Sequence, residues 1–150
     1  MTSDLEREPA PSERVVRAWR RLEESVDGWV CATARAADAL SMRAEFRTYL
    51  AACAERIVDL DAVETLYAEL VANCVRHAPG PVRIEWSWRE LALTVVDAVD
   101  RLRHWPFSAD DLHAERTHRC YAIVRALSDR VHVARDPAGG TRVRVALPLR

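Results

Sequence analysis

The spacing of apolar residues along the chain predicts four helices. Apolar residues recur every three or four positions, as on the buried face of a helix, at about 12–26, 41–58, 59–78 and 119–128. Ser12, Ser41, and Asp59 or Asp61 are suited to cap the first three helices, because a short polar side chain can accept hydrogen bonds from the first free backbone N–H groups. Pro79-Gly80-Pro81 predicts a sharp end to the third helix.

The pattern then changes to the two-residue period of strands. In residues 82–88 apolar residues alternate with Arg83, Glu85 and Ser87, which is typical of a half-buried strand. Further strands are expected at 91–96, 131–135 and 141–147, the last two joined as a hairpin by the turn 136–140. The short segment from Trp29 to Thr33 is also β-prone, but its length leaves it ambiguous.

The order of these elements predicts an α/β (α+β) two-layer sandwich. We expect a mostly antiparallel mixed sheet with helices on one face. Residues 1–28 are interpreted as an N-terminal tail and an extra helix, and residues 29–150 as the domain itself. Residues 98–118 contain Pro106 and many charges, so they are expected to form an irregular loop. A loop of that length in a compact domain is usually functional or mobile.

The composition excludes some kinds of catalytic chemistry and some kinds of partner. The formal net charge is −1, and all 22 basic residues are arginine, so a lysine nucleophile and a P-loop lysine are excluded. Without an overall basic balance we expect no nucleic-acid binding. The N-terminus does not resemble a signal peptide and no apolar run reaches membrane-spanning length, so we expect a cytoplasmic protein without a membrane partner. The four cysteines are widely spaced, which favours buried free thiols.

The candidate chemistry is concentrated on the third helix. Glu69, Asn73 and His77 are spaced at i, i+4 and i+8, so they form a polar stripe beside the apolar face of this helix. Asn73 is the only asparagine in the chain, and asparagine is a poor helix former. The stripe could wall a pocket. The simpler alternative is a solvated helix edge.

The run from Glu69 to Ala78, Glu-Leu-Val-Ala-Asn-Cys-Val-Arg-His-Ala, resembles the N-box of the GHKL (Bergerat-fold) histidine-kinase-like ATPases. It is most similar to the anti-sigma-factor serine kinase branch. Asp97 at the end of a strand, the helix that includes Ala122 to Arg130, and Gly139-Gly140-Thr141-Arg142-Val143 resemble later parts of the same family in the same order. The likeness covers about residues 29–150 and implies a Bergerat-like fold.

This resemblance implies roles for particular residues. Asn73 would bind Mg²⁺ through its side-chain oxygen, and Glu69 would orient or deprotonate an attacking hydroxyl or water. Asp97 would accept a hydrogen bond from the adenine amino group of ATP, and Thr141 would assist there. His77 is interpreted as structural. The implied function is an ATP-binding regulatory domain that phosphorylates or controls a partner protein, such as a sigma factor or an anti-anti-sigma-like regulator.

The sequence departs from this family at the glycines that approach phosphate. Asp97 is followed by Ala98-Val99-Asp100, and His118-Arg119-Cys120-Tyr121 stands where the family has a glycine-rich end of the ATP lid. Arg119, with His113, Arg116 and His118, could supply positive charge instead. Loss of nucleotide turnover is therefore an alternative, with the domain acting as a protein-binding module.

Three further features have two interpretations each. The pair Trp86 and Trp88 could stack on a ring or serve core or dimer packing, and a homodimer remains an alternative. The cluster Trp105-Pro106-Phe107 could cover a pocket or pack on the domain. The arginines of residues 14–21 form either a solvated face or part of a partner-binding helix. A purely structural dimerisation domain would leave Asn73 facing bulk solvent.

Overall fold

A computed structural model of the 150-residue chain describes residues 27–53, 58–99, 114–137 and 139–149, together with Arg14, Val16, Arg17 and Trp19. For residues 114–118 it describes the backbone only. The elements follow the order β1 (Gly28–Thr33), α2 (Ala36–Ser41), α3 (Arg43–Ala52), α4 (Leu60–His77), β2 (Val82–Ser87), β3 (Ala92–Asp97), α5 (Ala114–Leu127), β4 (Arg130–Arg135) and β5 (Thr141–Ala146).

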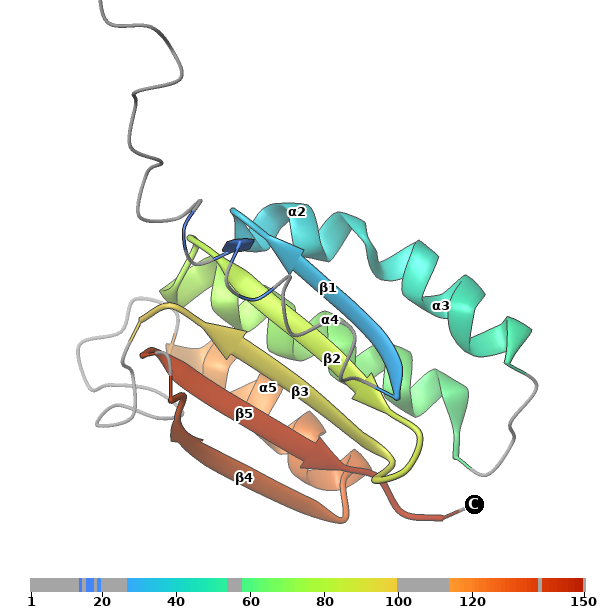
Figure 1. Ribbon diagram of the computed structural model, residues 1–150. Coiled ribbons are helices and arrows are strands. Elements are labelled where there is room, and N and C mark those ends of the chain that lie inside the picture. Colours follow the sequence, from blue (N-terminus) through green and yellow to red (C-terminus); the bar gives the residue numbers. More distant parts are fainter. Residues whose placement is uncertain are drawn as a thin grey trace, which may run out of the picture.

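The five strands form one sheet in the order β1-β2-β3-β5-β4, and every neighbouring pair is antiparallel. Helices α2 to α5 lie together on one face of this sheet (Figure 1). The predicted two-layer α/β architecture is therefore confirmed. The ambiguous segment 29–33 belongs to β1, where Trp29 pairs with Trp86 of β2.

The core lies between the sheet and the helices because alternate strand residues face the helices. Ile84 and Trp86 of β2, Leu93 of β3 and Val145 of β5 are fully buried there. This places Trp86 in the core, so the packing interpretation of that residue is confirmed. Trp88 follows the strand, and its ring meets that of Trp86 edge to face at 5.4 Å.

Helix α4 is the central helix of the layer. The Asp59 side chain accepts hydrogen bonds from the backbone N–H groups of Asp61 and Ala62, so it is the predicted N-cap. One face of α4 contributes Tyr67, whose ring stacks on Phe46 of α3 at 4.9 Å. The Tyr67 hydroxyl donates to the Ala39 carbonyl at 2.5 Å, and burial raises the pKa of Tyr67 above its usual value.

Two predicted helix starts are wrong. Ser41 does not begin a helix: it is the last residue of α2, and its hydroxyl donates back to the Ala37 carbonyl at 3.3 Å. Helix α2 begins at Ala36 without a side-chain cap, and the Ala36 N–H instead donates to the Pro79 carbonyl, at 3.1 Å. Helix α5 begins at Ala114, five residues earlier than predicted.

Most of the predicted N-terminal helix lies outside the described residues. Arg14, Val16, Arg17 and Trp19 are helical, with Val16 and Trp19 buried and the two arginines exposed. The cluster Trp105-Pro106-Phe107 and His113 also lie outside the described residues. No helix in the described part of the chain is long and apolar enough to cross a membrane.

Candidate functional site

Two predicted site residues, Asp97 and Thr141, lie at the end of the sheet toward which α4 runs. The connection 78–81 is short, so the C-terminal end of α4 lies close to the start of β2. There Val82 pairs with Asp97, the last residue of β3, and Asp97 pairs with Thr141, the first residue of β5. Figure 1 shows these strand ends together at one end of the sheet. We call Asn73, Asp97, Gly140 and Thr141 the polar corner.

Asn73 is buried, with 2% of its surface exposed, whereas Glu69 and His77 are half-buried. The alternative of a purely structural dimerisation domain predicted that Asn73 faces bulk solvent, and this prediction is wrong. The Asn73 Oδ1 atom accepts a 3.5 Å hydrogen bond from Arg76 Nη2. Another nitrogen of Arg76, Nε, is buried with no hydrogen-bond partner among the described residues. A buried asparagine that accepts from Arg76 is therefore not part of a solvated helix edge.

Arg76 was not predicted as a site residue. The available signal is its spacing: it follows Asn73 by three positions, so both lie on the same side of α4. The predicted stripe of Glu69, Asn73 and His77 follows a spacing of four residues, so it does not include this neighbour at a spacing of three. With Arg76 included, α4 offers a carboxylate, a carboxamide and a guanidinium along one side.

Helix α5 packs against α4 at the level of Glu69. The Cys120 thiol donates to the Glu69 backbone carbonyl at 3.3 Å. Burial raises the pKa of Cys120 to about 11, with a further rise from the Glu69 carboxylate and an opposing effect of Arg76. Glu69, Arg76 and Cys120 are therefore neighbours, as the electrostatic effect of each group on the thiol requires.

At the strand ends, the backbone of Val99 joins the two predicted adenine-binding residues. Asp97 is 1% exposed and accepts from the Val99 N–H at 2.9 Å through Oδ1, while the fully buried Thr141 hydroxyl donates to the Val99 carbonyl at 2.7 Å. Gly140 lies against this pair: a Cβ atom at that position would overlap the Asp97 carbonyl oxygen. The structure thus brings Asp97, Gly140 and Thr141 together at the strand ends.

The predicted lid end differs from the expectation. Arg119 was expected to open a helix, but it lies inside α5 and its side chain is exposed. Its backbone is therefore not part of a free helix N-terminus, where orphan N–H groups could meet phosphate. Arg119 does precede Cys120, which contacts Glu69, so the chain passes close to α4 at this point.

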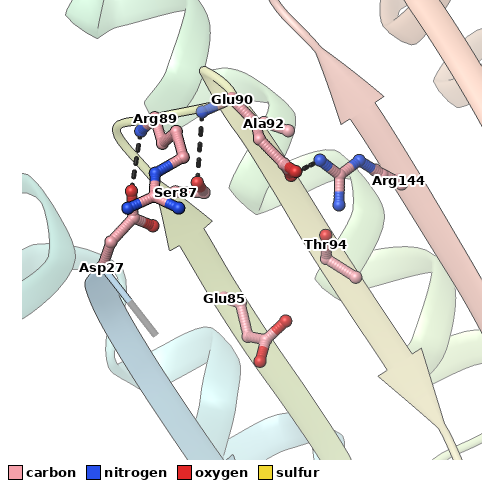
Figure 2. A pocket seen from close by; sticks show the side chains of 8 residues that line it. All are labelled: Asp27, Glu85, Ser87, Arg89, Glu90, Ala92, Thr94 and Arg144. Atoms are coloured by element: carbon pink, nitrogen blue, oxygen red, sulfur yellow. Dashed lines mark hydrogen bonds and ion pairs between the residues drawn. The ribbon is translucent and has the colours of Figure 1, made fainter. Parts of the chain in front are cut away.

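A separate hollow of about 270 Å³ lies on the outer face of the sheet, which the helices do not cover, and Figure 2 shows its lining. Several of its polar groups form hydrogen bonds or an ion pair with one another. The Asp27 carboxylate accepts from the Arg89 N–H at 2.8 Å, Ser87 Oγ accepts from the Glu90 N–H at 3.2 Å, and Arg144 pairs with Glu90. Hydrogen bonding from Ser87 is the main reason that the pKa of Asp27 is lowered. This hollow supports the β2–β3 turn.

The described residues contain no group of three or more His, Cys, Asp and Glu side chains that could hold a metal ion. Asn73 and Glu69 could therefore supply only part of a coordination shell for a divalent cation. Mg²⁺ commonly takes one or two protein oxygens and completes its shell with water and phosphate oxygens.

Comparison with known proteins gives only weak structural likeness. No family model matches the sequence, and no curated protein matches it. Among solved structures, the cytoplasmic segment of histidine kinase QseC matches with 16% sequence identity and a TM-score of 0.37, covering 96% of this chain and 99% of that chain. A TM-score of this size does not establish a common fold.

The buried thiol predicts a pH effect on stability. Because the pKa of Cys120 is raised from 9.0 to about 11 on folding, its contribution is complete below pH 9 and is lost as the pH rises toward 11. Between pH 8 and pH 9.5 we expect the free energy of unfolding to fall by about 1 kcal/mol from this group. Urea denaturation at both pH values measures it, and Cys120→Ala is the control. Equal losses in the two proteins would contradict the assignment.

Proposed function

We propose that this chain is an ATP-binding regulatory domain of the GHKL type, acting on a partner protein in the manner of anti-sigma-factor serine kinases. The observation that carries the proposal is the polar corner. An aspartate and a threonine, both essentially inaccessible to water, lie side by side at the strand ends, and the only asparagine of the chain lies at the same end of the domain. Burying a carboxylate is costly unless it is well hydrogen-bonded, so a buried aspartate beside a buried threonine at the strand ends supports a binding role for this corner.

The residues at the corner suit the adenine end of ATP. A carboxylate can accept the hydrogen bond that an exocyclic amino group donates, and Thr141 offers a hydroxyl beside it. The absence of a side chain at Gly140 keeps β5 tight against Asp97. In this proposal Asp97 reads the base, so ATP is preferred over GTP, which presents a carbonyl oxygen at the corresponding ring position.

The residues of α4 suit the phosphate end. The Asn73 side-chain oxygen fits a hard divalent cation, and bound Mg²⁺ would supply charge neutralisation for the phosphates. Glu69, half-buried one turn earlier, would hold the hydroxyl of the partner's serine and take its proton. Arg119 would contribute charge from α5, in place of the glycines that the family uses.

A second candidate is a protein-binding module of the same type without nucleotide turnover. It is favoured by the complete absence of glycine between residues 80 and 139, since close backbone approach to a triphosphate generally needs glycine. The position of Arg119 inside α5 points the same way, because it offers no free helix N-terminus there.

Calorimetric titration with ATP separates the two candidates. With Mg²⁺ present we expect micromolar binding to the wild type, and a loss of affinity of about tenfold or more in Asp97→Asn, because the substitution removes a charged acceptor. Asp129→Asn is the matched control, since Asp129 is exposed and lies away from the corner. Asn73→Ala should weaken binding with Mg²⁺ but have little effect in EDTA.

Circular dichroism of each variant checks that the fold is retained. If the folded wild type does not bind ATP at millimolar concentration, the kinase proposal is wrong and the binding-module candidate stands. Equal affinity for ATP and GTP would contradict the role of Asp97.

A further inference from the structure

The last hairpin carries a local excess of positive charge. The chain as a whole has a formal net charge of −1, but residues 125–146 contain five arginines and only two aspartates. Most of this charge lies on β4 and β5, the two strands at one side of the sheet. A charge asymmetry of this kind in a nearly neutral protein indicates a surface for a partner of the opposite sign.

Strand alternation places this charge on the outer face. Val131 and Val133 of β4 pack against the core, so Arg130 and His132 point to the other side of the sheet. On β5, Arg142 and Arg144 lie on that same side, and His132 is directly opposite Arg144. The outer face of this hairpin therefore carries two basic residues on each strand, at alternate positions, and Ala134 and Ala146 occupy the remaining outer positions.

Few of these basic side chains form an ion pair with another described residue. Arg144 pairs with Glu90, whereas Arg125, Arg130, His132 and Arg142 make no ion pair with any described residue. Arg125, Arg130 and His132 are exposed. Arg125, Arg130 and His132 line one hollow, so an acidic ligand bound there would meet basic side chains that no described residue neutralises.

The same residues line a hollow at the start of β4. It has a volume of about 440 Å³ and is lined by Arg125 of α5, by Arg130 and His132 of β4, by Arg144 of β5 and by the small or apolar side chains of Val131 and Ala146, together with Asp129. β4 is the last strand of the described sheet, so one of its edges has no strand beside it (Figure 1). Such an edge offers unpaired backbone N–H and C=O groups.

We propose that the free edge of β4 and its basic outer face bind an extended, acidic segment of a partner protein, which adds to the sheet as a sixth strand. Main-chain pairing would supply part of the affinity, and the alternating acidic side chains would meet Arg130 and His132 on the outer face, while Arg125 adds positive charge at the hollow where β4 begins. A nucleic acid fits less well, because a polyphosphate backbone cannot use the strand edge. This surface is distinct from the polar corner, and its function does not depend on ATP.

The test uses the full chain without nucleotide and a fluorescein-labelled octapeptide of alternating glutamate and valine. Fluorescence anisotropy at low salt should show saturable binding, and Arg125→Glu/Arg130→Glu should weaken it by about tenfold or more. The matched control is Arg14→Glu/Arg17→Glu, which changes the net charge equally at two exposed arginines far from the hairpin in sequence. This control should bind as the wild type does.

Two further probes decide the mode of binding. The same peptide with alternate backbone nitrogens methylated keeps its charges but cannot pair with a strand, so it should bind at least about tenfold more weakly. Equal binding of the methylated peptide, equal loss in both double variants, or equally tight binding of oligo-dT would each overturn the proposal. Failure of ATP binding would leave it unaffected.

Discussion

Replacing Gly140 with alanine is expected to lower the free energy of unfolding by about 4 kcal/mol or more, which for a domain of this size approaches complete unfolding. Gly140 has a φ of +91°, a conformation that side-chain-bearing residues rarely adopt. In addition, the new Cβ would overlap the carbonyl oxygen of Asp97, which belongs to the rigid strand β3. Neither problem can be relieved by rotating a side chain.

Gly139→Ala separates the two causes. Gly139 has almost the same φ, +93°, but a Cβ there would meet no atom of the described residues within 4 Å. It should therefore show the conformational cost alone, about 1–2 kcal/mol. Thermal and urea denaturation of both variants measure the difference. If both variants lose the same stability, the close approach of β5 to Asp97 does not contribute.

The difference between the Gly139 and Gly140 variants is also relevant to the proposed function. The pair Gly139-Gly140 is part of the family resemblance, and the structure gives Gly140 a physical reason: β5 passes tightly beside Asp97. In the proposed function Gly140 would lie beside the base-reading Asp97, whereas the chain has no glycine between residues 80 and 139, where the phosphates would be approached.

The parts of the fold that the sequence predicted well are those determined locally. Helix α4 has a side-chain cap at Asp59, a continuous apolar face and a proline-bearing stop, and its observed bounds match the prediction. Strand β2 alternates strictly between apolar and polar residues. Each signal comes from within a few residues of the element, so no knowledge of the rest of the chain was needed.

The errors arose where distant contacts decide. The start of α2 is set by the hydrogen bond from Ala36 to Pro79, more than forty residues away, and no local signal marks it. The short strand β1 depends on its pairing with β2. The start of α5 at Ala114 was missed because the first five residues of that helix, Ala-Glu-Arg-Thr-His, lack an apolar face.

At the candidate site, too, local features could be predicted from the sequence and long-range contacts could not. The helical spacing of Glu69 and Asn73 could be calculated, and so could their position beside the apolar face. The burial of Asn73 to 2% exposure, its contact with Arg76, and the approach of Cys120 to Glu69 could not, because they require α5 to pack on α4. The meeting of Asp97 with Thr141 depends likewise on strand order rather than on local sequence.

Trp86→Ala is expected to lower the free energy of unfolding by about 3–5 kcal/mol, because it removes a large, fully buried side chain from the centre of the sheet. Trp86→Phe should cost much less, below about 1.5 kcal/mol, since it retains an aromatic ring. The indole N–H of Trp86 is buried and has no hydrogen-bond partner among the described residues, so its loss offsets part of the cavity cost.

This pair of variants also tests the ring-stacking interpretation of Trp86 against its place in the core. Trp86 belongs to β2 and faces the helices, away from the polar corner at the strand ends. Trp86→Phe should therefore leave the affinity for ATP unchanged within about twofold, as calorimetry at a temperature where both proteins are folded can show. A large loss of nucleotide affinity in this stable variant would mean that the base stacks on the sheet and that Asp97 is not its recognition site.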